Sequence, residues 1–362
     1  MRITSVCIFI STFFYYGSAQ TTYGNEYLQI GVGARALAMS GSVHASVQDV
    51  NAAYWNPAAL SRLDVPLQLG LMHSDWFGGV GKYDHIGIAK TFNKDQYRVG
   101  SISLIRLAID QIPNTLNLIG PDGSIRLDNV TEFSTADYGV LLSYASAIGH
   151  VEENKSFRLG GTVKILRRVV GPFANAWGFG MDFGGLWIKN NLIIGIHVRD
   201  LTTTFTGWHY TFTQDQKILL QKTGNLLPVS TLEKTPPSVA GGLLMKINEN
   251  HKLTIHPEIG FTAYFDGKRN TVISSKTISI EPKLGIEVGY NKLIFLRAGF
   301  GNVQKIKDEF NPLLYNTRGQ LNAGLGIKIG KVNIDYALAN VGNLAREINY
   351  SHVFSATLGF GK

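Results

Sequence analysis

The feature that most constrains the fold of this chain is a strict alternation of apolar and polar or glycine residues over long segments. It is clearest in residues 157–168, 252–265, 277–290 and 319–329. In the last of these, Leu321, Leu325 and Ile329 are apolar while the residues between them include Asn322, Gly326 and Lys328. A period of two is typical of β-strands that have one apolar face and one polar face.

Two kinds of fold can bury such a pattern. A soluble β-sandwich places the apolar face inside, whereas a membrane barrel places it outside against lipid. Strands of soluble proteins usually have about 5–6 residues, but a tilted membrane strand needs about 9–11. The four segments match the longer class, and their polar faces carry many charges and glycines that suit a solvated or plugged lumen. We therefore predict an all-β fold, a membrane-spanning antiparallel β-barrel.

The number of alternating segments indicates a barrel of about fourteen strands. They centre on Leu69, Ile88, Leu104, Val140, Val163, Phe183, Ile194, Gly242, Ile259, Gly285, Ala298, Gly324, Asp335 and Thr357. Short connections at 93–96, 149–156, 189–190, 248–250, 291–292 and 330 alternate with long ones at 75–82, 110–132, 169–175, 202–235, 266–276, 302–318 and 340–350. Outer-membrane barrels have short periplasmic turns and longer extracellular loops. We therefore expect an outer-membrane location with the N- and C-termini periplasmic.

Composition excludes two other classes of protein. Of 362 residues, 44% are hydrophobic and 17% are charged, which excludes intrinsic disorder. The net charge is +8, but Lys and Arg are scattered singly, without a run that could follow a phosphate backbone. We expect outer-membrane lipid as a partner and no nucleic acid.

The first residues have the pattern of a secretory signal. Arg2 precedes an apolar stretch from Val6 to Tyr16, and Gly17-Ser18-Ala19 follows it. We predict a signal peptide over residues 1–19. Cys7 is the only cysteine of the chain and lies in this segment, so disulfides and cysteine-based metal sites are not expected in the mature protein.

Residues 20–65 do not alternate and are rich in Ala and Gly. Two stretches, Gly33–Met39 and Asn51–Leu60, are typical of short helices, and Pro57 should end a helix at Asn56. A barrel of about fourteen strands has an interior that wall side chains alone do not fill. We therefore predict a helical plug over 20–65 inside a barrel over 66–362. Five inward glycines are expected to make room for it: Gly178, Gly180, Gly184, Gly324 and Gly326.

The plug segment resembles the N-terminal signature of the PorV/PorQ family of outer-membrane proteins, which is related to the FadL barrel of fatty-acid transporters. The residues that carry the resemblance are Gly33, Ala34, Arg35, Ala36, Asp49, Tyr54, Trp55, Asn56 and Pro57. The resemblance implies a fourteen-stranded barrel. It also implies a role in type IX protein secretion, in which the barrel binds the translocon, secreted cargo or the surface attachment complex.

Two function classes follow. In the first, the barrel is a binding partner in type IX secretion, and the long 202–235 loop presents Trp208 and Tyr210 to a protein partner. In the second, the barrel is a FadL-like transporter of hydrophobic small molecules. Candidate residues for its pocket are Tyr54, Trp55, Ile102, Leu104 and Leu186.

Other chemistry has weaker support in the sequence. Residues 31–36 with Asp49 fit a dinucleotide-binding pattern, but the strand-helix-strand frame is missing, and neither GxSxG nor HExxH occurs. His73, His85, Asp75 and Asp84 could bind a metal, but solvation at a barrel rim explains them as well. We expect no enzyme, no catalytic or metal residues and no cofactor.

The polar strand faces carry charges that could form a selectivity path. The alternative is that opposite charges pair with each other and with the plug, which offsets the cost of removing them from water. These residues are Arg106, Lys164, Asp182, Arg199, Glu258, Glu281, Lys283, Glu287, Arg297, Lys328 and Asp335.

Overall fold

The computed structural model describes residues 24–93, 97–120, 123–152, 155–224, 226–228, 231–308, 311, 314–340 and 350–361. The predicted signal peptide, most of the 93–96 turn and most of the 340–350 loop lie outside these residues. In the described part of the chain, no helix is both long enough and apolar enough to span a membrane.

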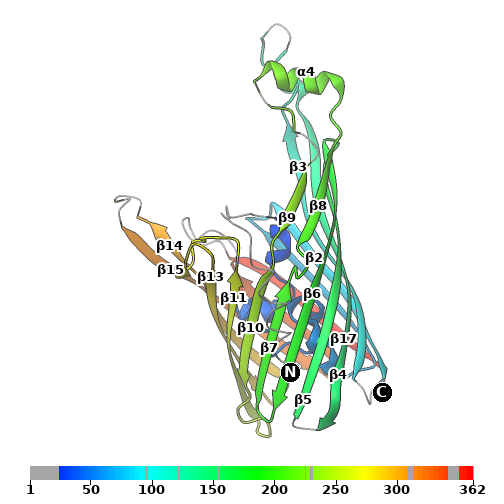
Figure 1. The fold of residues 1–362 in the computed structure, drawn as a ribbon, viewed down its shortest axis with the longest axis vertical. Coiled ribbons are helices and arrows are strands. Elements are labelled where there is room, and N and C mark those ends of the chain that lie inside the picture. Colours follow the sequence, from blue (N-terminus) through cyan, green and yellow to red (C-terminus); the bar gives the residue numbers. More distant parts are fainter. Residues whose placement is uncertain are drawn as a thin grey trace, which may run out of the picture.

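The described residues form one antiparallel sheet that closes on itself, because β1 pairs with both β2 and β17. Of its seventeen strands, fourteen make the ring, and β8, β9 and β12 are short additions. The prediction of a fourteen-stranded barrel is therefore confirmed (Figure 1). The ring strands are β1 Leu67–Trp76, β2 Gly81–Asn93, β3 Arg98–Asn114, β4 Thr131–Glu152, β5 Lys155–Val170, β6 Ala174–Lys189, β7 Leu192–Arg199, β10 Ser238–Met245, β11 Leu253–Tyr264, β13 Ser279–Tyr290, β14 Ile294–Lys307, β15 Tyr315–Ile329, β16 Val332–Ala339 and β17 Ser351–Phe360.

The outer face of the ring is apolar. Side chains exposed there include Ile86, Ile102, Leu142, Phe183, Ile259, Leu284, Leu325 and Ile334. Their neighbours in sequence point inward and are buried, as in β6, where Asp182 and Gly184 flank Phe183. An outer face with this many apolar side chains suits lipid, and the sheet closes into a ring, so the sandwich alternative, with its apolar face inside, is wrong.

One side of the barrel rises far above the rest. Figure 1 shows β3, β4, β5 and β6 extending past their neighbours, with β8 (Thr204–Tyr210) beside the upper part of β6. Helix α4 (Gln214–Lys222) lies at the tip and begins with a capping box in which Thr213 and Gln216 exchange hydrogen bonds. Strand β9 (Leu232–Thr235) completes a hairpin with β8. The 202–235 segment is therefore a strand-helix-strand unit instead of an open loop.

Two smaller differences concern connections. Strand β4 continues to Glu152 and β5 begins at Lys155, so the 149–156 connection is tighter than the sequence suggested. The long connections contain a two-residue strand, β12 (Ile273–Ser274), and a short 3-10 helix, η4 (Leu127–Asn129).

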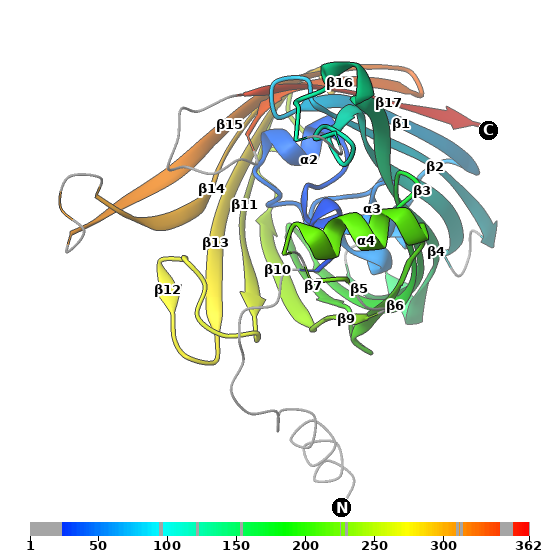
Figure 2. The same ribbon diagram turned by 90° about the horizontal axis from the view of Figure 1, so that it is seen from above.

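The plug segment lies inside the ring. Figure 2 shows α2 (Ala34–Ala38) and α3 (Ala52–Trp55) enclosed by the strands. Two 3-10 helices accompany them, η2 (Glu26–Gln29) and η3 (Pro57–Arg62). Helix α3 ends at Asn56, whose backbone is extended and whose side chain accepts a hydrogen bond from the Ala58 N–H at 3.2 Å. Pro57 then opens η3, so the predicted helix stop is confirmed.

Glycines on the wall allow the plug to approach closely. A Cβ on Gly184 would lie 2.2 Å from Asn56 Oδ1, and one on Gly324 would lie 2.6 Å from the Ala38 Cβ. These two of the five expected glycines therefore face the plug. The other three make room for something else, because Gly178 and Gly180 contact Thr206 and Thr204 of β8, and Gly326 contacts Arg297 and Asp335.

Candidate functional site

The plug separates two cavities in the lumen. A cavity of about 630 Å³, the long-loop vestibule, lies on the side of the long connections, between the plug and residues such as Phe77, Tyr264 and Arg269. A cavity of about 350 Å³, the short-turn vestibule, lies on the opposite side, between Arg35, Arg62 and wall residues such as Glu249 and Lys292. The two share no lining residue among those described, so the plug lies between two separate cavities.

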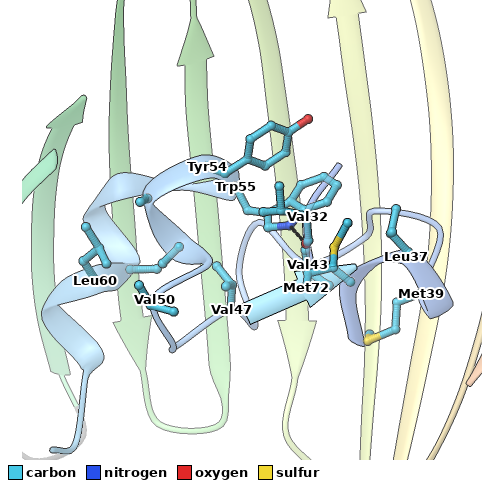
Figure 3. Packing of buried hydrophobic residues seen from close by; sticks show 14 of the residues in the cluster. Val32, Leu37, Met39, Val43, Val47, Val50, Tyr54, Trp55, Leu60 and Met72 are labelled. Atoms are coloured by element: carbon cyan, nitrogen blue, oxygen red, sulfur yellow. Dashed lines mark hydrogen bonds between the residues drawn. The ribbon is translucent and has the colours of Figure 1, made fainter. Parts of the chain in front are cut away.

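Aromatic side chains of the plug line the long-loop vestibule, with Trp55 at their centre. The Trp55 Nε1–H donates to the carbonyl of Val32 at 2.8 Å, which fixes the indole (Figure 3). Its ring makes edge-to-face contacts with the rings of His44 and Tyr54, with distances between ring centres of 5.6 and 4.9 Å. The plug therefore presents a rigid aromatic surface to this cavity.

Arg199 of β7 adds a cation to that surface. Its guanidinium lies 4.6 Å from the ring centre of Tyr54 and 5.7 Å from that of Trp55. One of its nitrogens, Nη2, is buried and has no hydrogen-bond acceptor among the described residues. An acceptor group on a bound molecule would satisfy it.

A second cation at the vestibule is already paired. Arg269 donates to both carboxylate oxygens of Asp266, at 2.9 and 2.5 Å, and lies 3.9 Å from the ring centre of Tyr264. Burial opposes the charge of Arg269, but the hydrogen bonds to Asp266 outweigh it and the pKa of the guanidinium is raised. This pair is part of the vestibule wall.

An ion network attaches the plug to the wall on the short-turn side. Arg35 binds Glu287 with two hydrogen bonds of 2.8 and 3.2 Å. Glu287 also accepts from Arg297 at 2.6 Å, and Arg297 donates to Asp335 at 2.7 Å. On the neighbouring β11, Glu258 accepts from the Ala45 and Ser46 N–H groups at 2.8 and 3.0 Å. These wall charges pair with each other and with the plug, as the second of the two alternatives predicted.

Burial also changes the titration of plug residues. The pKa of His44 lies well below its usual range because the ring is buried and Arg199 is close. Burial raises the pKa of Asp49, whose carboxylate accepts from the Asn51 N–H at 2.9 Å. Burial, together with Arg158 nearby, lowers the pKa of Arg62 to about 10. These pKa shifts all have burial as their main cause, so the ionisable groups of the docked plug are removed from water.

The motif residues of the plug lie where the plug contacts the wall. The Gly33 N–H points to Met72 Sδ at 2.9 Å, and the Ala34 N–H donates to Ser355 Oγ at 3.0 Å. Asn56 donates to the carbonyls of His44 at 2.9 Å and Gly185 at 3.2 Å. Residues 31–36 run from the connection after η2 into the first three residues of α2, outside any strand-helix-strand unit. No sequence pattern indicated the wall partners, because those contacts join residues far apart in the chain.

Three residues that were expected to face the lumen are on the outer face. Ile102 and Leu104 of β3 are 57% and 37% exposed there, and Arg106 shares their face. Arg106 donates to Asp84 at 3.2 Å on the outer surface. The inward positions of β3 are Ser101, Ser103 and Ile105, so the alternation was assigned to the wrong face of this strand. Of the other candidate pocket residues, Leu186 is inward and fully buried.

The histidines and carboxylates near the rim do not converge. His73 contacts Asp84 at 2.7 Å on the outer face, whereas His85 points inward and is buried. Adjacent β1 and β2 place these two histidines on opposite sides of the wall. Among the described residues, no group of three potential metal ligands could hold an ion.

Trp208 and Tyr210 lie on β8 and are half-buried. The Trp208 Nε1–H donates to Glu233 at 2.8 Å, and Arg168 lies 4.9 Å from the indole. The ring of Tyr210 stacks between those of Trp208 and Phe212, with distances between ring centres of 6.4 and 6.3 Å. More exposed apolar side chains lie in the connections near the tip, and these are Ile119, Ile125, Leu127, Ile218, Leu226 and Leu232.

The chain is similar in fold to several solved barrels. It matches the toluene transporter TodX of Pseudomonas putida with a TM-score of 0.54 and 14% identity over 91% of this chain and 98% of that one. It matches the monoaromatic hydrocarbon channel CymD with a TM-score of 0.55 and 12% identity, covering 92% of this chain and 98% of the other. A FadL homologue of Pseudomonas aeruginosa gives a TM-score of 0.50 and 12% identity, and the match covers 95% of this chain and 100% of that one.

No protein-family model and no curated protein sequence matches the chain. At 12–14% identity the likeness to solved structures shows the fold, which is a FadL-like fourteen-stranded barrel with short N-terminal helices.

Proposed function

We propose that this chain is an outer-membrane barrel that takes up small hydrophobic or amphipathic molecules through its long-loop vestibule. The observation that carries this proposal is a cavity of about 630 Å³ that the plug closes at its base and that Tyr27, Trp55, Phe77 and Tyr264 line. Cavities of about 300–1,000 Å³ are typical of small-molecule sites. This one combines the aromatic rings with a polar wall that includes Glu281, Lys283 and Asn322. Two structural neighbours, a toluene transporter and a monoaromatic hydrocarbon channel, support the same class of ligand.

The polar groups of the vestibule favour a molecule with an acceptor at one end. The apolar part would pack against the rings of Trp55 and Tyr264, and the acceptor would bind the free nitrogen of Arg199. A carboxylate suits this position best, because a charge-assisted hydrogen bond is stronger than a neutral one. The plug would then move to release the molecule.

Calorimetric titration of the purified barrel tests this proposal with two probes, dodecanoate and toluene. We expect both to bind, and we expect Arg199→Gln to weaken dodecanoate by roughly ten-fold or more while toluene changes little. Lys222→Gln on the exposed helix α4 is the matched control and should change neither. If neither probe binds the intact barrel, the proposal is wrong.

The position in the membrane is part of the same proposal. The apolar outer face supports lipid as the surrounding medium. By analogy with outer-membrane barrels, the short turns and both termini would be periplasmic and the raised β3–β6 side extracellular.

A role as a binding partner in type IX secretion is the second candidate. The resemblance of the plug motif suggests it, and the exposed apolar residues at the tip, Leu226 at 95% and Leu127 at 74%, favour a protein contact there. The half-buried Trp208 and Tyr210 would support the shape of that surface.

Co-purification from native membranes tests this role. Replacing Leu127 and Leu226 with Ser should reduce recovery of a translocon, cargo or attachment protein, while heat-modifiable gel mobility stays intact. Replacing Trp208 and Tyr210 with Ala should have the same effect if they shape the surface. Equal partner recovery from both variants and the wild type would argue against the secretion role.

A further inference from the structure

Unpaired polar groups are concentrated on one part of the inner wall. Twelve described residues bury a side-chain nitrogen or oxygen that has no hydrogen-bond partner, and six of them lie on the three consecutive strands β1, β2 and β3. All six are at least nine-tenths buried. They are Ser74, Trp76, Tyr83, His85, Ser101 and Ser103.

These six residues form a continuous stripe along the wall. The inward residues of β1, β2 and β3 that pair with one another form successive levels along the wall. From one end to the other, the unpaired groups at these levels are Trp76, then Ser74 with Tyr83, then His85, then Ser103, then Ser101. Every level from Trp76 to Gln68, which pairs through Ala89 with Ser101, therefore contributes at least one unpaired group. At about 3.3 Å per residue the stripe is roughly 26 Å long, close to the length of a membrane-crossing strand.

The plug makes hydrogen bonds with many strands of the wall, but none with β2 or β3 among the described residues from Asn25 to Leu63. It bonds to Tyr138 on β4, to Glu258 on β11, to Glu287 on β13 and to Ser355 on β17. The bonds of the plug to β1 are those of the Gly33 N–H with Met72 Sδ and of the Val50 N–H with Gln68 Oε1. Two of the three strands that carry the stripe therefore lack a hydrogen bond to these plug residues.

One apolar side chain covers the middle of the stripe. A Cβ on Gly70 would lie 2.3 Å from Val50 Cγ1, and one on Gly87 would lie 2.9 Å from Val50 Cγ2. Val50 therefore sits against two glycines between the level of His85 and the level of Ser101 (Figure 3 shows Val50 in the buried plug cluster). The position is fully buried.

Buried polar groups without partners are costly, and most proteins pair them. A stripe of hydroxyl, indole and imidazole groups that spans the wall is explained if these groups are hydrated in a second state of the barrel. We propose that the stripe is a permeation path for water and small hydrogen-bonding solutes, with Val50 as its seal. This activity is separate from binding in the long-loop vestibule.

The first experiment measures swelling of liposomes that contain the purified barrel, with glycerol and arabinose as the permeating solutes. Val50→Gly should raise both rates several-fold, and Gly70→Ala should do the same because its new Cβ displaces Val50. Val43→Gly removes an equally buried plug valine away from the stripe and should leave the rates near the wild-type value. Equal rates for Val50→Gly and Val43→Gly would overturn the proposal.

The second experiment separates a path from a merely loosened plug. In the Val50→Gly background, Tyr83→Phe and Ser103→Ala remove unpaired hydroxyls, so they should lower the swelling rate several-fold and leave the melting temperature equal or higher. Ser143→Ala on β4 removes a hydroxyl that is paired with Thr162 at 2.8 Å, so it should lower the melting temperature without changing the rate. Unchanged swelling in Tyr83→Phe and Ser103→Ala would refute the path. Dodecanoate binding, measured on the same proteins, reports on the vestibule independently.

Discussion

Arg35 shows how one residue can link the plug to the barrel. Its side chain leaves the short helix α2 and binds a wall carboxylate, Glu287, that also holds Arg297. All three groups are largely removed from water, so each depends on its partners for compensation. The motif requires Arg at this position because a guanidinium can hold a carboxylate with two hydrogen bonds.

Arg35→Met should loosen the plug. Removing one partner from a buried ion pair costs about 3–5 kcal/mol, and because Glu287 keeps Arg297 we expect the lower end of this range. Hydrogen exchange of the plug amides measures the free energy of local opening. The double variant Arg35→Met with Glu287→Gln also breaks the buried ion pair of Glu287 with Arg297, so its free energy of plug docking should fall further than in the single variant. Equal losses in the single and double variants would contradict this account.

His44 should make plug docking sensitive to pH. Burial, with Arg199 nearby, holds its pKa well below the usual value, so the docked ring stays neutral, while an undocked ring would titrate near pH 6.5. Protons therefore bind the undocked plug preferentially below that pH, and docking weakens as pH falls. At pH 5.5 the loss should be about 1.4 kcal/mol.

Hydrogen exchange at pH 7.5 and 5.5, corrected for the intrinsic pH dependence of amides, gives this quantity. The difference between the wild type and His44→Gln isolates the histidine from Asp49, whose raised pKa acts in the opposite direction. Identical pH dependence in the two proteins would show that His44 does not contribute.

At the scale of elements, the wall and the plug are stabilised in different ways. Each ring strand is hydrogen-bonded to two neighbours along most of its length, so the barrel is complete without the plug. The plug consists of short helices that are too short to be stable in isolation. Its helices persist because the wall buries them.

Deletion of residues 33–60 should leave barrel assembly intact and raise conductance in planar bilayers, because the two vestibules would then join. Replacement of α4 with a Gly-Ser linker of equal length is the control, and conductance should stay at the wild-type level. Unchanged conductance after the plug deletion would mean that the segment does not close the lumen in the membrane.

At the scale of the whole molecule, the barrel is strongly asymmetric. Strands β3 to β6 are up to 22 residues long, whereas β7, β10 and β16 have 8. The hairpin of β14 and β15 leans away from the axis on another side (Figures 1 and 2). The described short turns at 189–190, 248–250, 291–292 and 330 lie at the opposite end from the long connections, which supports a single orientation across a membrane.

Epitope tags can establish this orientation. Tags in the 110–132 and 202–235 connections should be accessible to antibody on intact cells, and tags at 93–96 or 248–250 only after the outer membrane is permeabilised. The reverse pattern would mean that both termini are extracellular.

The sequence by itself determined the class of fold and the number of strands. Lipid outside and a plugged lumen inside require alternation along every strand, so periodicity counts the strands and Pro57 marks the end of a helix without knowledge of any partner. The motif placed Arg35 and Asn56 in the plug segment, but it did not indicate that they contact the wall.

Only the tertiary structure decided which face of β3 is inside, because Ser101 and Arg106 make both faces of that strand partly polar. It also decided that β8 pairs with β6, that Glu287 meets Arg35, and that Val50 covers the polar stripe on Gly70 and Gly87. These contacts join residues far apart in the chain. The alternation of apolar and polar residues indicates only that the two faces of a strand differ. Which partner each face meets depends on how the closed ring brings distant segments together.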